Sequence, residues 1–363
     1  MSRTSEYVSL GHPDKIADYI SEYILDKLIS IDPKTRYALE VQIKSEYVSL
    51  AGEVSTIADV VEGDYQHWVK EAVNNIGYTK EYQNKWGKEN TICGDELGII
   101  CNFTQQSPDI AQGVDNLGWG DQGIFFGYAE NNKYTDYMPL DYYLAKDLNN
   151  KLYENAKNNN IGGLDIKTQI TLSDDNEIEQ VIVAIPTLDD KEYEDVKHFV
   201  IDWLSNENVD VMKFIEDGKL IINGTGKYQI HGPIGDSGTT GRKLVVDFYG
   251  GNSKIGGGSP WTKDGTKADL TLNLYARDIA LQKVKMLSND IKNLFYVETK
   301  ISCCIGKQTI RVVNTWYDVD GCKIDKEEYE ERPNRNDLIV KYQLDKSIYS
   351  SMRSEGLFSQ IRA

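Results

Sequence analysis

The 363-residue chain has few cysteines and prolines and a deficit of positive charge. Its odd number of cysteines forms neither a disulfide framework nor a CxxC metal motif, so we expect free, mostly buried thiols at 93, 101, 303, 304 and 322. With 40 Lys and Arg against 57 Asp and Glu, the net charge of -17 argues against binding a nucleic-acid backbone. No apolar run approaches the ~20 residues of a membrane span, and the amino-terminal residues lack a secretory pattern. The sequence therefore predicts a cytoplasmic protein that does not bind membranes.

Helical and extended hydropathy patterns alternate along the chain. Hydrophobic residues make up 40% of it, enough for a packed core, and 363 residues suggest two or three domains. Apolar spacing predicts helices over 13–31, 56–76, 140–153, 190–205 and 267–288. Strands are predicted over 37–44, 166–172, 181–185, 219–222, 243–249, 292–303 and 307–314. Helices followed by pairs of strands favour an α+β fold, while the Asn-rich 155–160 and the charged 323–336 are expected to be loops.

Glycine and positive charge concentrate in one segment, residues 223–269. It holds 12 of the chain's 30 glycines, and its six Lys and Arg outnumber its four Asp. Glycine allows a backbone to approach a ligand closely, and clustered cations hold oxyanions, so this segment predicts a phosphate site. The alternative is a set of plain turns between strands. A P-loop is excluded because five residues separate Gly235 from Gly241 and a strand is predicted to follow.

Two further segments carry candidate chemistry. GHPDK at 11–15 places a proton donor, a magnesium ligand and a cation at the start of a predicted helix, where anions are favoured. A capped helix with incidental charges is the competing interpretation. SPDI at 107–110 and GDQGIFFGYA at 120–129 place acidic and amide side chains between glycines, although a tight turn before a buried strand would have the same pattern.

Together these motifs resemble the signature segments of the S-adenosylmethionine synthetase (methionine adenosyltransferase) family. The matching segments, in the family's order, are SEYVSLGHPDKIAD at 5–18, QSPDIAQGVD at 106–115, GDQGIFFGYA at 120–129, GPIGDSGTTGRKLVVDFYGG at 232–251 and GGGSPWTKDGTKAD at 256–269. The resemblance covers about 5–315 and fades beyond.

The resemblance implies a fold of three similar α/β domains around a pseudo-threefold axis, with mixed and antiparallel sheets. We place the domains at 1–102, 114–231 and 232–363. It also implies that the protein joins the adenosyl group of ATP to the sulfur of L-methionine and then cleaves the released triphosphate to pyrophosphate and phosphate. The family acts as a homodimer with active sites between subunits, and a tetramer is the alternative assembly.

The resemblance further implies a role for each matching residue. Two Mg²⁺ per site and one K⁺ are expected, with Asp14 and Asp269 as magnesium ligands and Glu40 as the potassium ligand. The catalytic group is expected to comprise His12, Lys15, Arg242, Lys243, Lys263 and Lys267. ATP is expected to contact His12, Asp165, Lys167, Lys227, Tyr228, Asp236, Arg242, Lys243, Ser259 and Lys263. Methionine is expected to contact Glu53, Gln106, Asp121, Asp236, Lys267 and Ile305.

The chain departs from the family pattern in several places. The segment 111–119 is shorter than the family's gate over the active site, which predicts a weakly closing lid and release of some triphosphate. Trp119 is expected to replace part of the lost cover. Tyr228 stands where Phe is usual, and His231 where Gly is usual. The sequence leaves open whether Cys303 and Cys304 have a role beyond packing.

Two other functions compete with this interpretation. A non-catalytic, nucleotide-binding regulatory relative would have lost cations or metal ligands, yet all of those named above are present. A general triphosphatase or kinase would not need the residues that match the methionine site. Formation of S-adenosylmethionine from ATP and methionine separates the three.

Overall fold

Three long helices are each followed in the chain by an antiparallel strand hairpin. The computed structural model describes residues 2–104, 118–158, 161–207 and 209–361. The three repeats are α1 (Pro13–Ile31) with β2 (Arg36–Lys44) and β3 (Tyr47–Ser55), α5 (Leu140–Lys157) with β6 (Lys167–Leu172) and β7 (Ile178–Ala184), and α10 (Ala268–Leu287) with β10 (Tyr296–Cys303) and β11 (Ile310–Tyr317). The predicted pattern of helices and strand pairs is confirmed.

Each hairpin gains a third strand from the residues that follow it. After β3, helices α2 (Glu62–Ile76) and α3 (Lys80–Trp86) and the short η1 (Gly94–Glu96) lead to β4 (Gly98–Thr104), which pairs parallel to β3. After β7, helices α6 (Asp190–Asn206) and α7 (Val211–Glu216) lead to β8 (Leu220–Ile222), parallel to β7. In the last repeat β12 (Lys323–Glu331) follows β11 directly and is antiparallel to it.

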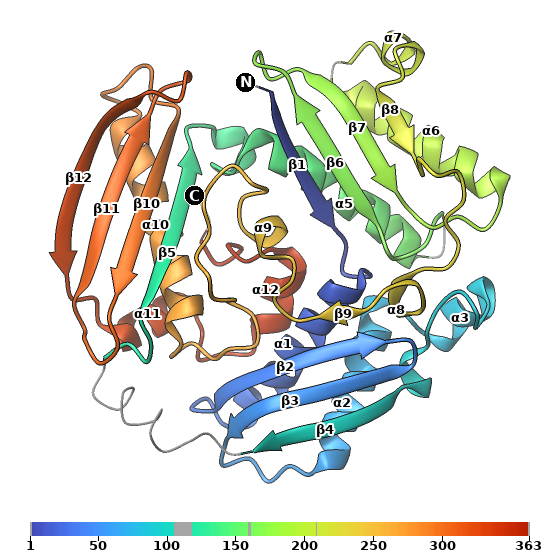
Figure 1. Ribbon diagram of the computed structural model, residues 1–363, viewed down its shortest axis with the longest axis horizontal. Coiled ribbons are helices and arrows are strands. Elements are labelled where there is room, and N and C mark those ends of the chain that lie inside the picture. The colour runs from blue at the N-terminus through green and yellow to red at the C-terminus, as the bar shows by residue number, and fades with distance from the viewer. Residues whose placement is uncertain (1, 105–117, 159–160, 208, 362–363) are drawn as a thin grey trace.

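The fourth strand of each sheet comes from another part of the chain. β1 (Arg3–Val8) pairs with β6, β5 (Gly123–Glu130) with β10, and the two-residue β9 (Gly238–Thr239) with β2, all antiparallel. The strand orders are therefore β9-β2-β3-β4, β1-β6-β7-β8 and β5-β10-β11-β12. Figure 1 shows the three sheets arranged around the centre of the molecule. The three-domain α+β fold is confirmed, and its units are interlocked because each sheet takes its first strand from elsewhere.

The core lies between the sheets and the long helices. α1 contacts β2 and β9, α5 contacts β1 and β6, and α10 contacts β5 and β10. Alternation along β2 shows how the sequence specifies this packing: Tyr37, Leu39 and Ile43 are buried, whereas Glu40 and Lys44 face solvent. The polar outer face of the sheet is thus available for other contacts.

The carboxy-terminal residues pack against α1. The last two helices of the chain are α11 (Arg335–Lys341) and α12 (Tyr349–Glu355). Three short elements lie earlier between the long ones: η2 (Lys133–Thr135), α8 (Gly232–Gly235) and α9 (Leu244–Asp247). The carboxylate of Asp26 on α1 accepts hydrogen bonds from the backbone N–H groups of Tyr349 and Ser350, each at 2.8 Å. α12 is therefore capped by a side chain from the opposite end of the sequence.

Several local predictions are wrong. The predicted strand at 243–249 contains the single helical turn α9, in which Val246 is buried and Val245 is 48% exposed, and none of the described strands pairs with it. The charged 323–336 holds β12 and the start of α11, not a loop. α2 begins at Glu62, six residues late, where the Asp64 side chain bonds the Val61 backbone. α5 continues to Lys157, into the predicted Asn-rich loop.

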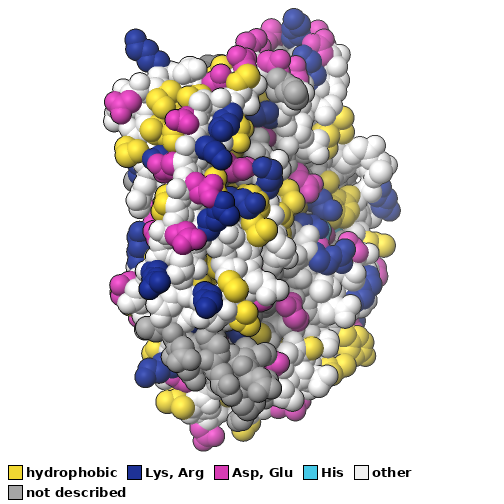
Figure 2. Space-filling view, turned by 60° about the vertical axis from the view of Figure 1, so that its left-hand side comes forward, with side chains coloured by type: hydrophobic (Ala, Val, Ile, Leu, Met, Phe, Trp, Pro, Cys, Tyr) yellow, Lys and Arg dark blue, Asp and Glu magenta, His cyan; other side chains and the backbone are white. Residues whose placement is uncertain are grey.

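The cysteines and the surface also bear on the predictions. All five cysteines are free thiols as expected, but only Cys93 is buried, so the prediction of mostly buried thiols is wrong. On the face that Figure 2 shows, Lys and Arg side chains are interspersed with Asp and Glu. In the part of the chain that the structure describes, no helix is both long enough and apolar enough to cross a bilayer.

Candidate active site

The amino-terminal end of α1 carries two of the predicted residues. His12 immediately precedes the helix, and its Nδ1 atom accepts a hydrogen bond from the backbone N–H of Asp14 at 3.1 Å. Both side chains are almost completely buried. Pro13 occupies the first helical position, where its missing N–H has no cost. Since this end of a helix carries partial positive charge, it favours a bound anion.

The glycine-rich turn after β9 docks on Asp14. Oδ1 of Asp14 accepts from the backbone N–H of Thr239 at 2.9 Å, and Oδ2 lies 2.7 Å from Nζ of Lys243. Nε of Arg242 lies 3.7 Å from Oδ1. A side chain at Gly238 would overlap with the backbone at the start of α1. The structure therefore brings together predicted residues that are 229 positions apart.

The electrostatics of this cluster suit an anionic ligand. Burial lowers the pKa of His12 to about 2, and the positive charges of Lys167 and Lys243 act in the same direction while Asp236 opposes them. The imidazole is therefore neutral near pH 7. Because its Nδ1 accepts a hydrogen bond, the ring proton lies on Nε2. His12 can thus donate an N–H to a phosphate oxygen that neighbouring cations attract.

A second group of predicted residues surrounds Asp165, just before β6. Asp165 is buried, and its Oδ2 accepts from the backbone N–H of Gly232 at 2.9 Å. Its Oδ1 is buried without a hydrogen-bond partner among the described residues. Burial raises the pKa of this carboxyl to about 6. An unpaired buried oxygen is costly, so this atom is suited to accept from a ligand.

The predicted basic–aromatic pair lies beside Asp165. The hydroxyl of Tyr228 donates to the backbone carbonyl of Asp165 at 3.3 Å. Lys227 is exposed next to a cleft whose wall includes Tyr193 and Gln229. The structure thus joins Asp165, Lys227 and Tyr228 at one place.

Glu40 lies on the outer face of β2 beside two threonines. Its carboxylate accepts hydrogen bonds from Thr240 and, at 3.3 Å, from Thr262. These threonines belong to the two glycine-rich turns that carry the predicted cations. Carboxylate and hydroxyl oxygens are ligands that alkali and alkaline-earth cations prefer.

Lys263 and Asp269 form an ion pair near Glu40. Lys263 pairs with Ala38 across a β-bridge, and Asp269 lies in the first turn of α10. A side chain at Gly258 would overlap with the Asp269 carboxylate, so the glycine run passes directly over it. Two more predicted residues lie here. Lys267 immediately precedes α10. Ser259 lies beside Gly241, because a Cβ added to Gly241 would be 3.3 Å from its side chain.

Two of the predicted methionine-binding residues, Glu53 and Asp121, lie toward this ion pair. Glu53 on β3 lies opposite Ala38, the residue bridged to Lys263. The backbone carbonyl of Asp121 accepts from the Cys303 thiol at 3.3 Å, and burial raises the pKa of that thiol to about 12. Asp236 and Asp121 are exposed, as is Ile305.

Some of the predictions fall outside the described residues. Gln106 and the gate residues 111–117 are among these. Trp119 is 1% exposed and its backbone pairs with Lys307 and Gly306, so it anchors the segment that leads into β5. That it replaces part of the lost cover stays a prediction.

Lys15 does not join the cations of the site. Its ammonium group is buried and ion-paired with Asp247, which also pairs with Arg353 at 2.8 Å. Arg353 lies 3.0 Å from Asp18, and Asp18 accepts from the backbone N–H of Gly241 at 2.8 Å. The prediction that Lys15 is catalytic is therefore corrected, because its charge is used to balance Asp247.

Sequence reasoning missed this buried network. Asp18, Glu22 and Asp26 follow each other at four-residue steps on α1, and each is buried. Glu22 accepts from the backbone N–H of Thr262 at 2.6 Å. A row of acidic residues on the buried face of an amphipathic helix could have indicated a buried charge network. Nothing in the sequence around Arg353 indicated its part in this network, since it lies beyond the recognisable motifs.

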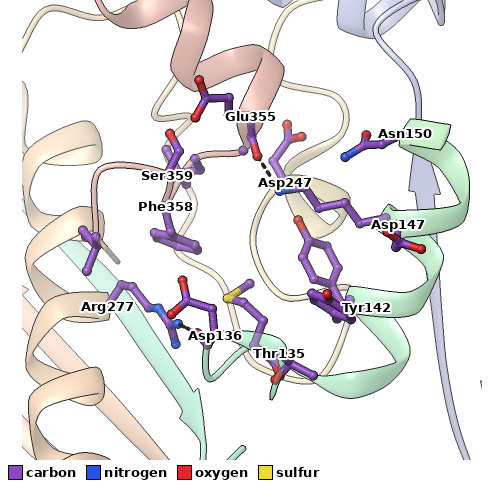
Figure 3. Close-up of a pocket in the computed structure, with 16 residues that line it drawn as sticks. Thr135, Asp136, Tyr142, Asp147, Asn150, Asp247, Arg277, Glu355, Phe358 and Ser359 are labelled. Atoms are coloured by element: carbon purple, nitrogen blue, oxygen red, sulfur yellow. Dashed lines mark hydrogen bonds between the residues drawn. The ribbon is translucent and has the colours of Figure 1, made fainter. Parts of the chain in front are cut away.

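A separate pocket contains none of the predicted site residues. It measures about 270 Å³ and lies between α5, α10 and the carboxy-terminal segment. Figure 3 shows Tyr142 and Asp147 on α5, Arg277 on α10, and Phe358 at its wall. This pocket is therefore distinct from the glycine-rich site.

The chain matches three family models that together span most of its length. These describe the N-terminal, central and C-terminal domains of S-adenosylmethionine synthetase and match residues 1–108, 116–228 and 230–362. Among its relatives is an S-adenosylmethionine synthase of Mycobacterium marinum, 34% identical over 98% of this chain and 93% of that protein. One from Clostridium tetani is 36% identical over 76% of this chain and 73% of its own.

A solved structure supports the same relationship. The structure of an unusual S-adenosylmethionine synthetase from Campylobacter jejuni superimposes with a TM-score of 0.79 at 30% identity. The match covers 98% of this chain and 94% of that one.

Proposed function

Because the chain belongs to the S-adenosylmethionine synthetase family, we propose that it transfers the adenosyl group of ATP to the sulfur of L-methionine. The released triphosphate is then hydrolysed to pyrophosphate and phosphate. The observation that carries the proposal is the cluster at the start of α1, where His12, Arg242 and Lys243 gather around Asp14 in a chain of net charge -17.

The chemistry explains why cations are concentrated here. A thioether sulfur is an uncharged nucleophile and needs no general base, so the main demand is to stabilise the negative charge that develops on the departing triphosphate. Lys167, Arg242, Lys243, Lys263 and Lys267 are the cations that we assign to this task. His12, neutral with its proton on Nε2, donates to a phosphate oxygen near the bond that breaks.

The nucleotide is bound mainly by the residues around Asp165. The unpartnered Oδ1 of Asp165 is the acceptor offered to it, the ring of Tyr228 packs on the base, and Lys227 and Ser259 complete the contacts. Methionine is bound by Glu53, Gln106, Asp121, Asp236, Lys267 and Ile305.

The acidic residues fit two Mg²⁺ and one K⁺. Among the described residues, no three His, Cys, Asp or Glu side chains form a ready-made metal site. Asp14 and Asp269 are isolated carboxylates beside cations, an arrangement suited to Mg²⁺ that is shared with phosphate oxygens. Glu40, with the hydroxyls of Thr240 and Thr262, would hold K⁺. When bound, these ions neutralise charge on the triphosphate.

The active form is proposed to be a homodimer, with a tetramer as the alternative. Apolar side chains are exposed on the strands of two sheets, with Tyr47 on β3 at 66%, Ile100 on β4 at 59% and Ile124 on β5 at 47%. A second copy of the chain would cover them. The active sites would then lie between the two subunits, each of which contributes residues. The site of action is proposed to be the cytoplasm.

One assay tests the proposed reaction. The protein is incubated with ATP, methionine, Mg²⁺ and K⁺, and S-adenosylmethionine, pyrophosphate, phosphate and triphosphate are quantified. A methionine-dependent sulfonium product is expected. Nucleotide binding without this product would favour the non-catalytic regulatory relative and overturn the proposal.

A further inference from the structure

His231 lies at the centre of a buried aromatic cluster. It is completely buried, and its ring centroid lies 4.7 Å from that of Trp86, 5.7 Å from that of Tyr82 and 6.3 Å from that of Tyr78. Its backbone N–H donates to the carbonyl of Asn90 at 3.0 Å. The segment that follows Tyr228 is therefore attached to α3 and the residues after it.

The hydrogen bonds of His231 determine its tautomer. Nδ1 lies 2.8 Å from the backbone carbonyl of Gln229, which can only accept, so Nδ1 carries the proton. Burial lowers the pKa of this imidazole to about 4, so it is neutral near pH 7. Nε2 is then an acceptor, and the hydroxyl of Tyr82 donates to it at 2.7 Å.

Tyr82 extends this bond to the nucleotide side of the site. Its oxygen accepts from the backbone N–H of Leu164 at 2.9 Å. The next residue is Asp165, whose Oδ2 accepts from the N–H of Gly232, the neighbour of His231. The hydrogen bonds thus form a closed ring from His231 through Tyr82, Leu164 and Asp165 to Gly232.

Gly232 lies directly against Tyr78. Its φ is +59°, and a Cβ there would lie 2.6 Å from the hydroxyl of Tyr78, so only glycine fits at this position. That hydroxyl donates to the backbone carbonyl of Gly11 at 2.6 Å, next to His12. The cluster therefore braces both segments that lead into the site.

We propose that His231 is a positioning residue for nucleotide binding, acting through Tyr82 to fix the peptide of Leu164 and Asp165. The unpartnered Oδ1 of Asp165 is thereby held in place to accept from the nucleotide. This inference rests on the proposed function, since it assumes that Asp165 contacts ATP.

Two substitutions of His231 separate its two hydrogen bonds. In His231→Gln the amide can take the place of Nε2 and accept from Tyr82, whereas in His231→Asn the shorter amide reaches only the Gln229 carbonyl. Tyr82→Phe keeps the ring and removes the hydroxyl. Tyr349→Phe is the matched control, because the buried hydroxyl of Tyr349, the first residue of α12, donates to the Leu344 carbonyl at 2.8 Å.

Binding of a non-hydrolysable ATP analogue with Mg²⁺ is measured on the full chain, together with kcat and both KM values. His231→Asn and Tyr82→Phe should raise the Kd of the analogue and the KM of ATP roughly tenfold, the effect of one lost hydrogen bond at a buried acceptor. kcat and the KM of methionine should change less than about twofold. His231→Gln should stay within about threefold, and Tyr349→Phe should match wild type.

A double-mutant cycle with Asp165→Asn tests whether His231 acts through Asp165. The double variant with His231→Asn should bind no more than about twofold more weakly than Asp165→Asn alone. Additive losses would overturn the inference, as would equal losses in the Gln and Asn variants. If His231→Asn fails to fold, wild-type affinity in Tyr82→Phe also overturns it. A wild-type protein that does not bind the analogue overturns the proposed function itself.

Discussion

Nζ of Lys243 lies 2.7 Å from Oδ2 of Asp14, and this ion pair joins the start of α1 to the glycine-rich turn after β9. A buried carboxylate needs a positive partner, and in this structure Lys243 supplies it. In the proposed reaction, Mg²⁺ shares or replaces that role. Asp14 is therefore the residue whose loss should change the metal dependence most directly.

Asp14→Asn should lower turnover by roughly 10²–10³ and raise the Mg²⁺ concentration needed for half-maximal rate, because an amide is a weaker metal ligand than a carboxylate. Formation of S-adenosylmethionine against MgCl₂ concentration measures both effects. Asp195→Asn, at an exposed position on α6, is the control. An unchanged Mg²⁺ dependence in Asp14→Asn would exclude Asp14 as a ligand.

Lys263→Ala should reduce product formation by roughly 10²–10³, since it removes a cation that we assign to the triphosphate. The midpoint of thermal unfolding should fall by no more than about 2 °C, because its ion pair with Asp269 is partly exposed. Lys254→Ala, in the same glycine-rich segment but paired at the surface with Glu298, should keep full activity. Equal rates in the two variants would contradict the assignment of Lys263.

Arg353→Met should destabilise the protein by about 3–5 kcal/mol, because it leaves Asp18 and Asp247 buried with Lys15 as their remaining cation. Denaturant unfolding measures the loss. Arg332→Met, at an exposed position, should change the free energy of unfolding by less than about 0.5 kcal/mol.

The double variant Asp18→Asn with Arg353→Met restores electrical balance and should be more stable than Arg353→Met alone. If the double variant were the less stable of the two, charge balance would not explain the network.

His231→Gln should change the pH dependence of stability in a defined direction. The pKa of His231 is lowered from 6.5 to about 4, so below pH 6.5 the unfolded chain takes up a proton that the folded chain does not. Wild type therefore loses stability from this group as pH falls. The free energy of unfolding of wild type, minus that of the variant, should fall by about 2 kcal/mol when the pH is lowered from 7 to 5. Buried carboxyls with raised pKa change stability with pH in the opposite direction. They are the same in both proteins, so their effect cancels in the difference between the two free energies of unfolding. A constant difference would contradict the burial of a neutral His231.

Local patterns allowed part of the fold and site to be predicted. Period-two alternation identified β2, and apolar spacing after His12 identified α1, because both patterns depend on neighbours in the chain. The motifs at 11–15 and 232–269 also predicted that Asp14 and Lys243 belong to one site, and the structure places them 2.7 Å apart.

What the sequence could not reveal depends on distant partners. The charged sequence of β12 resembles that of a loop, and its strand conformation depends on pairing with β11. The sequence of Leu244–Asp247 resembles that of a strand, but no strand in the described part of the chain lies alongside it. Lys15 was misassigned for the same reason: its partner, Asp247, lies 232 positions away. The role of His231 likewise depends on Tyr82 of α3.

Each sheet takes one edge strand from a distant part of the chain, and this has a consequence for synthesis on the ribosome. The sheet of β2, β3 and β4 cannot be completed until Gly238–Thr239 has emerged, and Gly241 is not braced until Arg353 has been made. A nascent chain that stops early therefore exposes an unpaired strand edge, a feature that promotes aggregation and recognition by chaperones. The glycine-rich turn after β9 is therefore held against Asp14 and Asp18 only after most of the chain has been made.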